Sequence, residues 1–209
     1  MTRRLILVRH GRTEDNAAGR MISASDPALD ALGREQAERV AEALAGCPAA
    51  AVYSSPRRRA VETAEAIARR RTGGIGEEVP IRLDDRLAEL GFGAFEGRTE
   101  AQIRAAGAGA LFEAWRQGVP PRYPAGAESF EEAGQRALAF FSSAFPEAAD
   151  AIVVGHGHQL RILLAVAVLG APAPLHRRLR LDHARLAVVE WEGPTPRLAL
   201  LNVPRLPAL

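Results

Sequence analysis

Lysine is missing from this chain of 209 residues, so all 27 of its basic side chains are arginines. The absence excludes Schiff-base enzymes and Walker-type phosphate loops, because both use a lysine. The formal net charge is only +2, and aromatic residues are scarce at 5%. The arginines are also scattered along the chain, so a nucleic-acid partner is not expected.

Cysteine and long apolar runs are scarce as well. The single cysteine, Cys47, excludes an internal disulfide framework and fits a reducing compartment. Residues 1–15 lack the long apolar core and cleavage site of a signal peptide. The longest apolar run, Ile162–Leu169, is too short to span a bilayer. We therefore expect a cytoplasmic protein without a membrane partner.

The chain does contain enough apolar material for one large core. Hydrophobic residues make up 47% of the sequence, and 209 residues suit a single α/β domain better than two. Neither an internal repeat nor a linker divides the chain. The domain is therefore expected to span residues 1–209.

An apolar run near the start, Leu5–Val8, predicts a strand that is buried on both faces. It ends abruptly at Arg9-His10-Gly11, which places a cation, an imidazole and a flexible residue at the carboxyl end of a parallel strand. Ligand sites of open α/β sheets form at that end. A glycine there lets a ligand approach the backbone closely, and Asn16 follows within reach.

A second stretch repeats this design. Residues 151–155 form another short apolar run, which ends in His156-Gly157-His158. Two buried strands that both end in His-Gly indicate that the imidazoles of His10 and His156 converge on one site.

Hydrophobic spacing and capping residues predict the remaining elements. Asp30 is a suitable N-cap for a helix that Gly46 and Pro48 would end. Further helices are expected over 56–70, within 99–118, over 129–145 and over 159–169; strands over 50–53 and 79–83; a C-terminal antiparallel hairpin of 186–191 and 198–203; and loops at 17–28, 72–78 and 171–178. The pattern indicates an α/β fold with three layers, in which helices flank a mostly parallel central sheet.

The segment after the strand expected over 50–53 is a candidate anion-binding site. Ser54-Ser55-Pro56 opens a helix whose free N–H groups and dipole attract negative charge. Three arginines, at 57, 58 and 59, follow in its first turns. From the residues alone, we expect two of the three to be solvated.

A carboxylate in a separate segment is a candidate general acid. Glu89 lies among apolar residues broken by glycines, where partial desolvation suits that role. Glu96 is its competitor, and we expect it to be structural.

These motifs resemble the histidine phosphatase superfamily, which includes phosphoglycerate mutase. The signature segment is Arg9-His10-Gly11 with Thr13 and Asn16. The resemblance extends over most of the chain, through 33–37, Ser54-Ser55-Pro56 with Arg59-Ala60 and Thr63-Ala64, 87–97 and 124–129. It implies that Arg59 is a phosphate ligand and that Glu89 is the acid. We also expect a helical lid at about 99–147.

The resemblance implies phosphoryl transfer through His10. A neutral histidine can attack phosphorus through one ring nitrogen while the other donates to a backbone carbonyl. Arg9, Arg59 and a protonated His156 would bind phosphate oxygens, and Glu89 would protonate the departing alkoxide and then activate water. Substrate contacts are expected from Asn16, Ser23, Gly157 and His158. With this many cations no metal is needed for charge, so neither a metal nor a cofactor is expected.

The chain departs from the family pattern around the non-phosphate end of the substrate. Arg12 stands where Glu or Gln is usual, Ile22 and Ser23 where a polar residue and Gly are common, and His158 where Asn or Gly is common. The Arg-Arg substrate motif of the mutases is also missing. We therefore expect a metal-independent phosphoric monoester hydrolase that acts on a small phosphorylated metabolite. The sequence leaves a homodimer open.

Three alternatives remain. A phosphoglycerate mutase-type phosphotransferase would use the same residues. A metal-dependent hydrolase would use His10, His156 and His158, because the His-x-His spacing puts alternate side chains on one face of a strand. The adjacent arginines would repel its cation. A phosphate-binding module without catalysis is disfavoured, because all the expected catalytic residue types are present.

Overall fold

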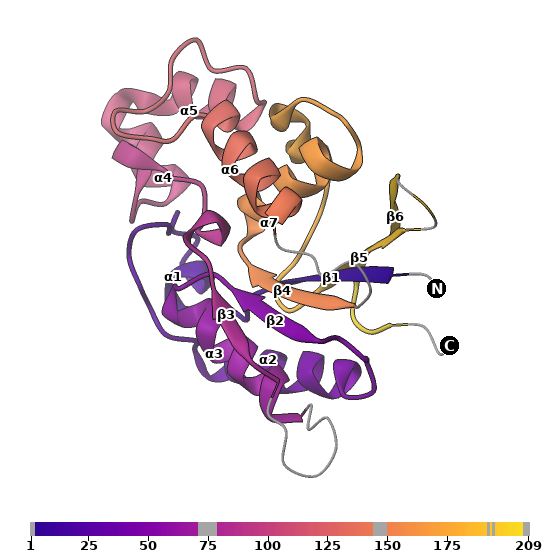
Figure 1. Cartoon of the computed structure of the whole chain (residues 1–209). Helices are drawn as coiled ribbons and strands as arrows, with labels where there is room; N and C mark the ends of the chain where they lie inside the picture. The colour runs from indigo at the N-terminus through magenta and orange to yellow at the C-terminus, as the bar shows by residue number, and fades with distance from the viewer. Residues whose placement is uncertain (1–2, 71–78, 144–149, 192, 194, 207–209) are drawn as a thin grey trace.

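The computed structural model describes residues 3–70, 79–143, 150–191, 193 and 195–206. At its centre is a six-stranded sheet in the order β3-β2-β4-β1-β5-β6 (Figure 1). The strands are β1 (Arg3–Arg9), β2 (Ala51–Ser54), β3 (Ile81–Leu83), β4 (Ala151–Gly155), β5 (Leu186–Trp191) and β6 (Pro196–Val203). The first four strands in the spatial order run parallel, whereas β5 and β6 pair antiparallel. The predicted mixed sheet with its C-terminal hairpin is confirmed.

Helices cover both faces of this sheet. They are α1 (Glu14–Ala17), α2 (Ala31–Leu44), α3 (Arg58–Arg70), α4 (Glu100–Ile103), α5 (Gly109–Arg116), α6 (Phe130–Ser143) and α7 (Gly157–Leu163). Helices α2 and α3 lie against one face, and α6 and α7 against the other (Figure 1). The predicted three-layer α/β architecture is therefore confirmed.

The central residues of strand β1, Leu5–Val8, form an uninterrupted apolar run because both of their faces are buried. Successive side chains of a strand point to opposite faces. Leu5 and Leu7 accordingly join the core beneath α6 and α7, while Ile6 and Val8 join the core beneath α2 and α3. All four side chains are fully buried, so the strand has no solvent-facing side that a polar residue could occupy.

The register of the sheet brings the strand ends together. Arg9 of β1 lies opposite Gly155 of β4, and Ser54 of β2 lies opposite Val154. The residues that follow these three strands therefore meet at one edge. Because β5 is antiparallel to β1 and its first residue, Leu186, lies opposite Val8, the turn before β5 reaches the same edge.

Capping residues explain where helices begin, although some helix boundaries differ from those predicted from the sequence. The Asp30 carboxylate accepts a hydrogen bond from the Gly33 backbone N–H at 2.6 Å, as expected of the N-cap of α2. Helix α7 begins at residue 157, two residues earlier than predicted, and the loop predicted for 171–178 contains a 3-10 helix, Ala173–Arg178. The short helix α1 was not predicted. The loop predicted for 72–78 and the end of the helix predicted for 129–145 lie outside the described residues.

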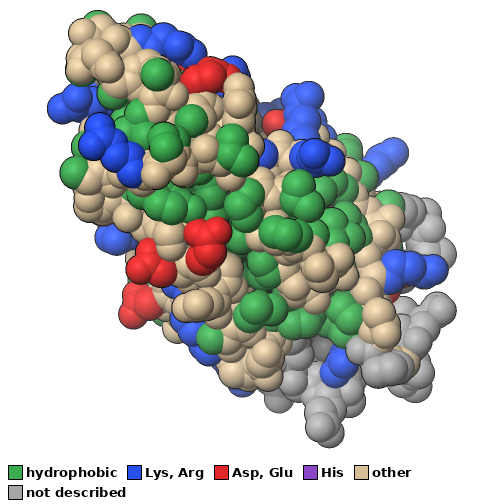
Figure 2. Space-filling view, turned by 90° about the horizontal axis from the view of Figure 1, so that it is seen from above, with side chains coloured by type: hydrophobic (Ala, Val, Ile, Leu, Met, Phe, Trp, Pro, Cys, Tyr) green, Lys and Arg blue, Asp and Glu red, His purple; other side chains and the backbone are tan. Residues whose placement is uncertain are grey.

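The segment predicted as a lid contains three helices of different character. Helix α6 buries Phe130 and Phe140 in the core above the sheet, whereas α4 and α5 lie further out on the same side (Figure 1). Viewed from above, apolar side chains cover much of this face, and arginines lie mainly around its margin (Figure 2). No helix in the described part of the chain is long and apolar enough to cross a membrane.

Candidate active site

His10 follows β1 and is held through one ring nitrogen. Its Nδ1 lies 2.6 Å from the Gly11 carbonyl oxygen. A carbonyl can only accept, so Nδ1 carries the proton and Nε2 bears the lone pair. Burial, followed by the proximity of His156 and of the guanidinium groups of Arg59 and Arg9, holds the pKa of His10 well below its ordinary 6.5. The imidazole is therefore neutral, and its Nε2 has no hydrogen-bond partner among the described residues.

Two buried arginines approach this imidazole without a carboxylate partner in the described ranges. Arg9 donates to the Leu181 carbonyl oxygen and to His183 Nε2, both at 2.9 Å. Arg59, which is 1% exposed, donates to the Ser25 carbonyl oxygen at 3.0 Å. Burial lowers the pKa of Arg9 to about 10 and also lowers that of Arg59. Both guanidinium groups stay charged at neutral pH and keep further N–H groups for an anion.

His156 follows β4 and lies beside His10, with their ring centroids 5.0 Å apart. Its Nε2 is 2.8 Å from the Ser55 hydroxyl oxygen, while its buried Nδ1 has no partner among the described residues. Burial and then Arg59 lower the pKa of His156 well below 6.5. A protonated imidazole was expected from the sequence, but burial and the surrounding arginines favour the neutral ring.

The Glu89 carboxylate lies at the start of α7. It accepts hydrogen bonds from the backbone N–H groups of Leu90, His158 and Gln159 at 2.9, 3.1 and 3.0 Å, all to Oε1. Oε2 accepts only from His158, at 3.2 Å. The side chain is 8% exposed, so burial and backbone contacts fix its position.

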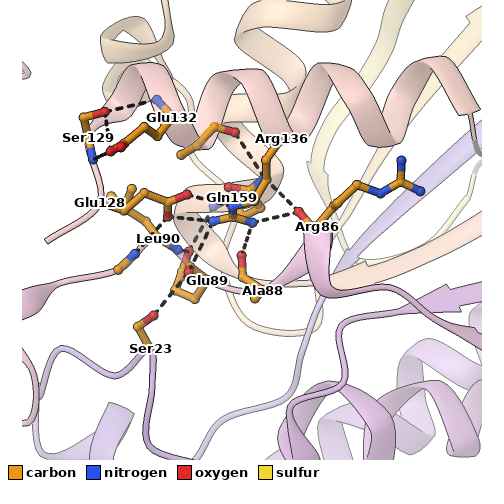
Figure 3. A network of polar contacts seen from close by, with 12 residues as sticks. Ser23, Arg86, Ala88, Glu89, Leu90, Glu128, Ser129, Glu132, Arg136 and Gln159 are labelled. Carbon is orange, nitrogen blue, oxygen red and sulfur yellow. Dashed lines mark hydrogen bonds and ion pairs between the residues drawn. The ribbon is translucent and has the colours of Figure 1, made fainter.

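A polar network holds the backbone around Glu89 (Figure 3). Arg136 of α6 donates to the carbonyl oxygens of Arg86 and Ala88, both at 2.7 Å. Glu128 pairs with the same guanidinium at 2.7 Å. The Ser23 hydroxyl donates to the Glu89 carbonyl oxygen at 3.2 Å. The loop that carries the carboxylate is thus tied to α6 and to the segment after α1.

Two of the predicted substrate residues have partners within the protein. Ser23 is 7% exposed, and its N–H donates to the Glu96 carboxylate at 2.9 Å. Both its N–H and its hydroxyl therefore make hydrogen bonds within the protein. Glu96 also accepts from Ser25, which supports the structural role expected for it. Asn16 caps α1 together with Thr13: its Oδ1 accepts the Thr13 N–H at 3.2 Å, which leaves the amide NH₂ group as a donor.

Glycines permit two close approaches at this edge. A Cβ on Gly157 would lie 3.0 Å from Arg9 Cζ, so a side chain there would displace the guanidinium. A Cβ on Gly11 would lie 2.4 Å from the Gly33 carbonyl oxygen, and one on Gly33 would lie 1.9 Å from the Arg12 carbonyl oxygen. The loop after His10 therefore packs directly on the start of α2.

Sequence reasoning missed two histidines and one arginine near the site. His183, from the turn before β5, has its ring centroid 5.5 Å from that of His10. His176 contacts His158, and Arg177 stacks on Trp115 with its Cζ 3.9 Å from the ring centroid. A signal was available in composition: the chain has only five histidines, and two of them lie shortly before the predicted hairpin.

Comparison with known proteins identifies the family. The sequence profile of the histidine phosphatase superfamily (branch 1) matches residues 5–204. The chain belongs to this superfamily. The chain is 38% identical over 200 residues to the probable phosphoglycerate mutase GpmB of Proteus mirabilis, a match covering 92% of this chain and 86% of the relative. The resemblance seen in the sequence is thereby confirmed.

Two phosphatases are also similar to this chain. The glucosyl-3-phosphoglycerate phosphatase of Mycolicibacterium vanbaalenii is 37% identical over 180 residues, covering 81% of this chain and 76% of the relative. The structure of a mycobacterial glucosyl-3-phosphoglycerate phosphatase in complex with VO3 superposes with a TM-score of 0.81 at 33% identity, covering 96% of this chain and 99% of that one. The relatives thus include both phosphatases and proteins named as mutases.

Proposed function

We propose that the protein is a phosphoric monoester hydrolase that acts on a small phosphorylated metabolite through a phosphohistidine on His10. The observation that carries the proposal is the arrangement around this imidazole. The Gly11 carbonyl fixes the proton on Nδ1, so the neutral Nε2 is a nucleophile, and Arg9 and Arg59 supply uncompensated positive charge beside it.

The first step forms the phosphoenzyme. The Nε2 lone pair of His10 attacks phosphorus, and the bond between phosphorus and the ester oxygen breaks. Arg9, Arg59, the Nδ1–H of His156 and the amide of Asn16 donate to the phosphoryl oxygens as charge develops there. Glu89 gives its proton to the departing alkoxide. We assign that proton to Oε2, because Oε1 already accepts three backbone N–H groups.

The second step returns the enzyme to its starting state. Glu89 removes a proton from a water molecule, which attacks the phosphohistidine. The P–N bond breaks, inorganic phosphate leaves, and Glu89 is again protonated. Because arginine guanidinium groups supply the positive charge, the steps need no metal ion.

The three imidazoles invoked for a metal-dependent hydrolase do not share one centre. His10 and His156 lie side by side, whereas His158 contacts His176, Phe92 and Trp115 instead. Within the described ranges no group of three or more His, Cys, Asp or Glu residues could hold a metal ion. Turnover that survives excess chelator and is blocked by vanadate would support the histidine mechanism; restoration by a divalent ion after chelation would contradict it.

The mutase alternative is kept because a relative at 38% identity is named a probable phosphoglycerate mutase. Both reactions pass through the same phosphohistidine, and they differ in whether water or an alcohol takes the phosphoryl group. The protein is therefore incubated with a set of phosphorylated metabolites that includes 3-phosphoglycerate, and inorganic phosphate and isomer are measured together. Phosphate release without isomer supports the hydrolase, and isomer in excess of phosphate overturns it.

Replacing Glu89 by Gln tests the acid. For alkyl phosphates kcat should fall by about 10²–10⁴-fold, because the alkoxide then leaves without a proton. For aryl phosphates the loss should be much smaller, because a phenolate leaves unassisted. Glu96→Gln is the matched control, since that carboxylate binds backbone N–H groups and should affect both substrates alike. Equal losses for the two substrates in Glu89→Gln would remove Glu89 from the acid role.

A further inference from the structure

A pair of imidazoles lies next to the phosphate-binding residues and is not used by the proposed chemistry. His158 is the second residue of α7, and His176 belongs to the 3-10 helix Ala173–Arg178. His158 Nδ1 lies 3.0 Å from His176 Nε2, and His176 Nδ1 lies 2.8 Å from the Ala173 carbonyl oxygen. His176 is fully buried, whereas His158 is half-buried.

The backbone carbonyl fixes the proton positions along this pair. Because the Ala173 carbonyl only accepts, the proton of His176 is on Nδ1. Burial, followed by Arg177, lowers the pKa of His176 to about 3, so its Nε2 bears a lone pair. That lone pair must accept the Nδ1–H of His158. Burial and Arg161 likewise lower the pKa of His158 well below 6.5, so its Nε2 also bears a lone pair.

One neighbouring contact could suggest the opposite tautomer. Arg161 Nη2 lies 3.4 Å from the same Nδ1 of His158. If it donated there, His158 and His176 would face each other with two lone pairs, or His176 would need a second proton. The 3.0 Å separation of the two rings argues against the first arrangement, and the burial of His176 beside Arg177 argues against the second. Arg161 is instead satisfied by the carbonyl oxygens of Gly157 and Leu179.

His158 adjoins the carboxylate that is proposed to protonate the leaving oxygen. The backbone N–H of His158 donates to the Glu89 carboxylate at 3.1 Å, so the ring adjoins the group that protonates the leaving oxygen. Phe92 and Trp115 flank the ring, with centroids 5.5 and 5.6 Å away. No hydrogen bond to His158 Nε2 is present in the described part of the chain, and the residue is half-buried.

We propose that His158 Nε2 accepts a hydrogen bond from a hydroxyl group on the alcohol portion of the substrate, and that His176 is the positioning residue that keeps this nitrogen unprotonated. The substrate class is then phosphate monoesters of polyols or sugars, with a second hydroxyl near the ester oxygen. This inference rests on the proposed hydrolase activity.

The test compares two phosphate esters that differ in one hydroxyl, 1,2-propanediol 1-phosphate and n-propyl phosphate. The wild-type ratio of kcat/KM should favour the diol ester by about three- to tenfold, the effect of one hydrogen bond between neutral groups. In His158→Phe this ratio should fall to about one. Turnover of an aryl phosphate without a hydroxyl measures any general loss in the same variant, and the diol-to-propyl ratio is independent of that loss because both esters are compared on one variant.

A second variant tests the positioning role. His176→Phe removes the acceptor, so His158 can place its proton on Nε2, and the ratio should again fall toward one. The double variant His158→Phe, His176→Phe should show no further loss of discrimination, because both changes act on one hydrogen bond. If His176 served only to fill the core, its replacement would slow all three substrates alike.

Two outcomes overturn the proposal. An unchanged diol-to-propyl ratio in His158→Phe removes the hydrogen bond, and a parallel loss on the aryl phosphate places His158 in the phosphate site instead. Nitrogen-15 NMR of histidine-labelled protein gives a readout independent of turnover: Nδ1 of His158 should carry the proton and Nε2 should not. Failure of the hydrolase proposal is seen separately, as absence of aryl phosphate turnover by the wild type.

Discussion

Strands β1 and β4 are neighbours that end in the same His-Gly pair, yet their two imidazoles are held through opposite nitrogens. His10 is held through Nδ1 by the carbonyl of the next residue, Gly11, while His156 is held through Nε2 by the hydroxyl of Ser55, which follows β2. A carbonyl dictates where the proton lies, whereas a hydroxyl can donate or accept. The shared motif therefore sets the position of each ring, and the anchor sets its chemical role.

The difference suits two tasks in phosphoryl transfer. A nucleophile needs a lone pair at a fixed nitrogen, which the rigid carbonyl anchor of His10 supplies. A phosphate ligand needs a donor, and Ser55 can donate to His156 Nε2 so that the proton of the ring stays on the buried Nδ1. Burial and the nearby Arg9 and Arg59 lower the pKa of both rings, so both are neutral.

The largest expected effect separates the two histidines. His10→Ala should reduce turnover by at least about 10⁴-fold and abolish phosphoenzyme formation, because no other nucleophile replaces it. His156→Ala should cost about 10²–10³-fold in kcat, as expected for one lost donor to the transition state, and should still form the phosphoenzyme. Single-turnover labelling with a phosphorylated substrate measures both quantities.

Two results would contradict this comparison. Labelling of the His10→Ala variant, or failure of His156→Ala to label, would mean that the roles of the two histidines are exchanged. The double variant His10→Ala, His156→Ala is a useful control. Its turnover should be no slower than that of His10→Ala alone when the two residues act on the same step.

A smaller effect is expected at the anchor of His156. Ser55→Ala removes the hydroxyl that orients the ring and should lower kcat/KM by about three- to tenfold, since one hydrogen bond is lost. Ser54→Ala is the matched control: its hydroxyl donates to the Ser55 carbonyl oxygen at 2.9 Å and does not touch the imidazole. Steady-state kinetics on an aryl phosphate should therefore distinguish two adjacent buried serines. Equal effects would show that the Ser55 hydroxyl acts only through packing.

The sequence was sufficient to predict those elements that are determined by residues close together in the chain. The apolar run before Arg9-His10-Gly11, the Asp30 cap and the hairpin at the end are each decided by neighbouring residues, and the structure confirms these elements. The family pattern also directed attention to Glu89 and Arg59, whose chemical roles remain predictions.

Contacts between distant segments could not be predicted in the same way. The bond from Arg9 to His183 joins residues 174 positions apart, and the one from His158 to His176 joins residues 18 apart. The 3-10 helix that supplies His176 lies in a stretch rich in proline and arginine, which reads as a loop because it lacks an apolar period. The backbone-carbonyl anchor of His10 was expected on chemical grounds and is supplied by the next residue, whereas the Ser55 anchor of His156 is 101 positions away and was not predicted.

The burial of the histidines has a consequence for the protonation equilibrium of the whole fold. All five histidines of the chain have a lowered pKa, in two cases to about 3. Above the ordinary histidine pKa of about 6.5, folded and unfolded chains are both neutral at these positions, and stability is unaffected. Below it, the unfolded chain binds protons that the folded one excludes, so unfolding takes up protons.

This linkage makes the stability of the fold depend on pH, and the number of protons taken up on unfolding can be measured. Each excluded proton lowers the free energy of unfolding by up to about 1.4 kcal/mol per pH unit, or up to about 7 kcal/mol per pH unit for five. Urea unfolding at pH 7.5 and at pH 5.5 should show this fall, and calorimetry in buffers of different ionisation enthalpy should count the protons taken up. Vanadate should reduce the count if its negative charge raises the pKa of His156. Burial keeps His10 unprotonated, so that it can attack phosphorus. The same burial determines how far the pH can fall before the protein unfolds.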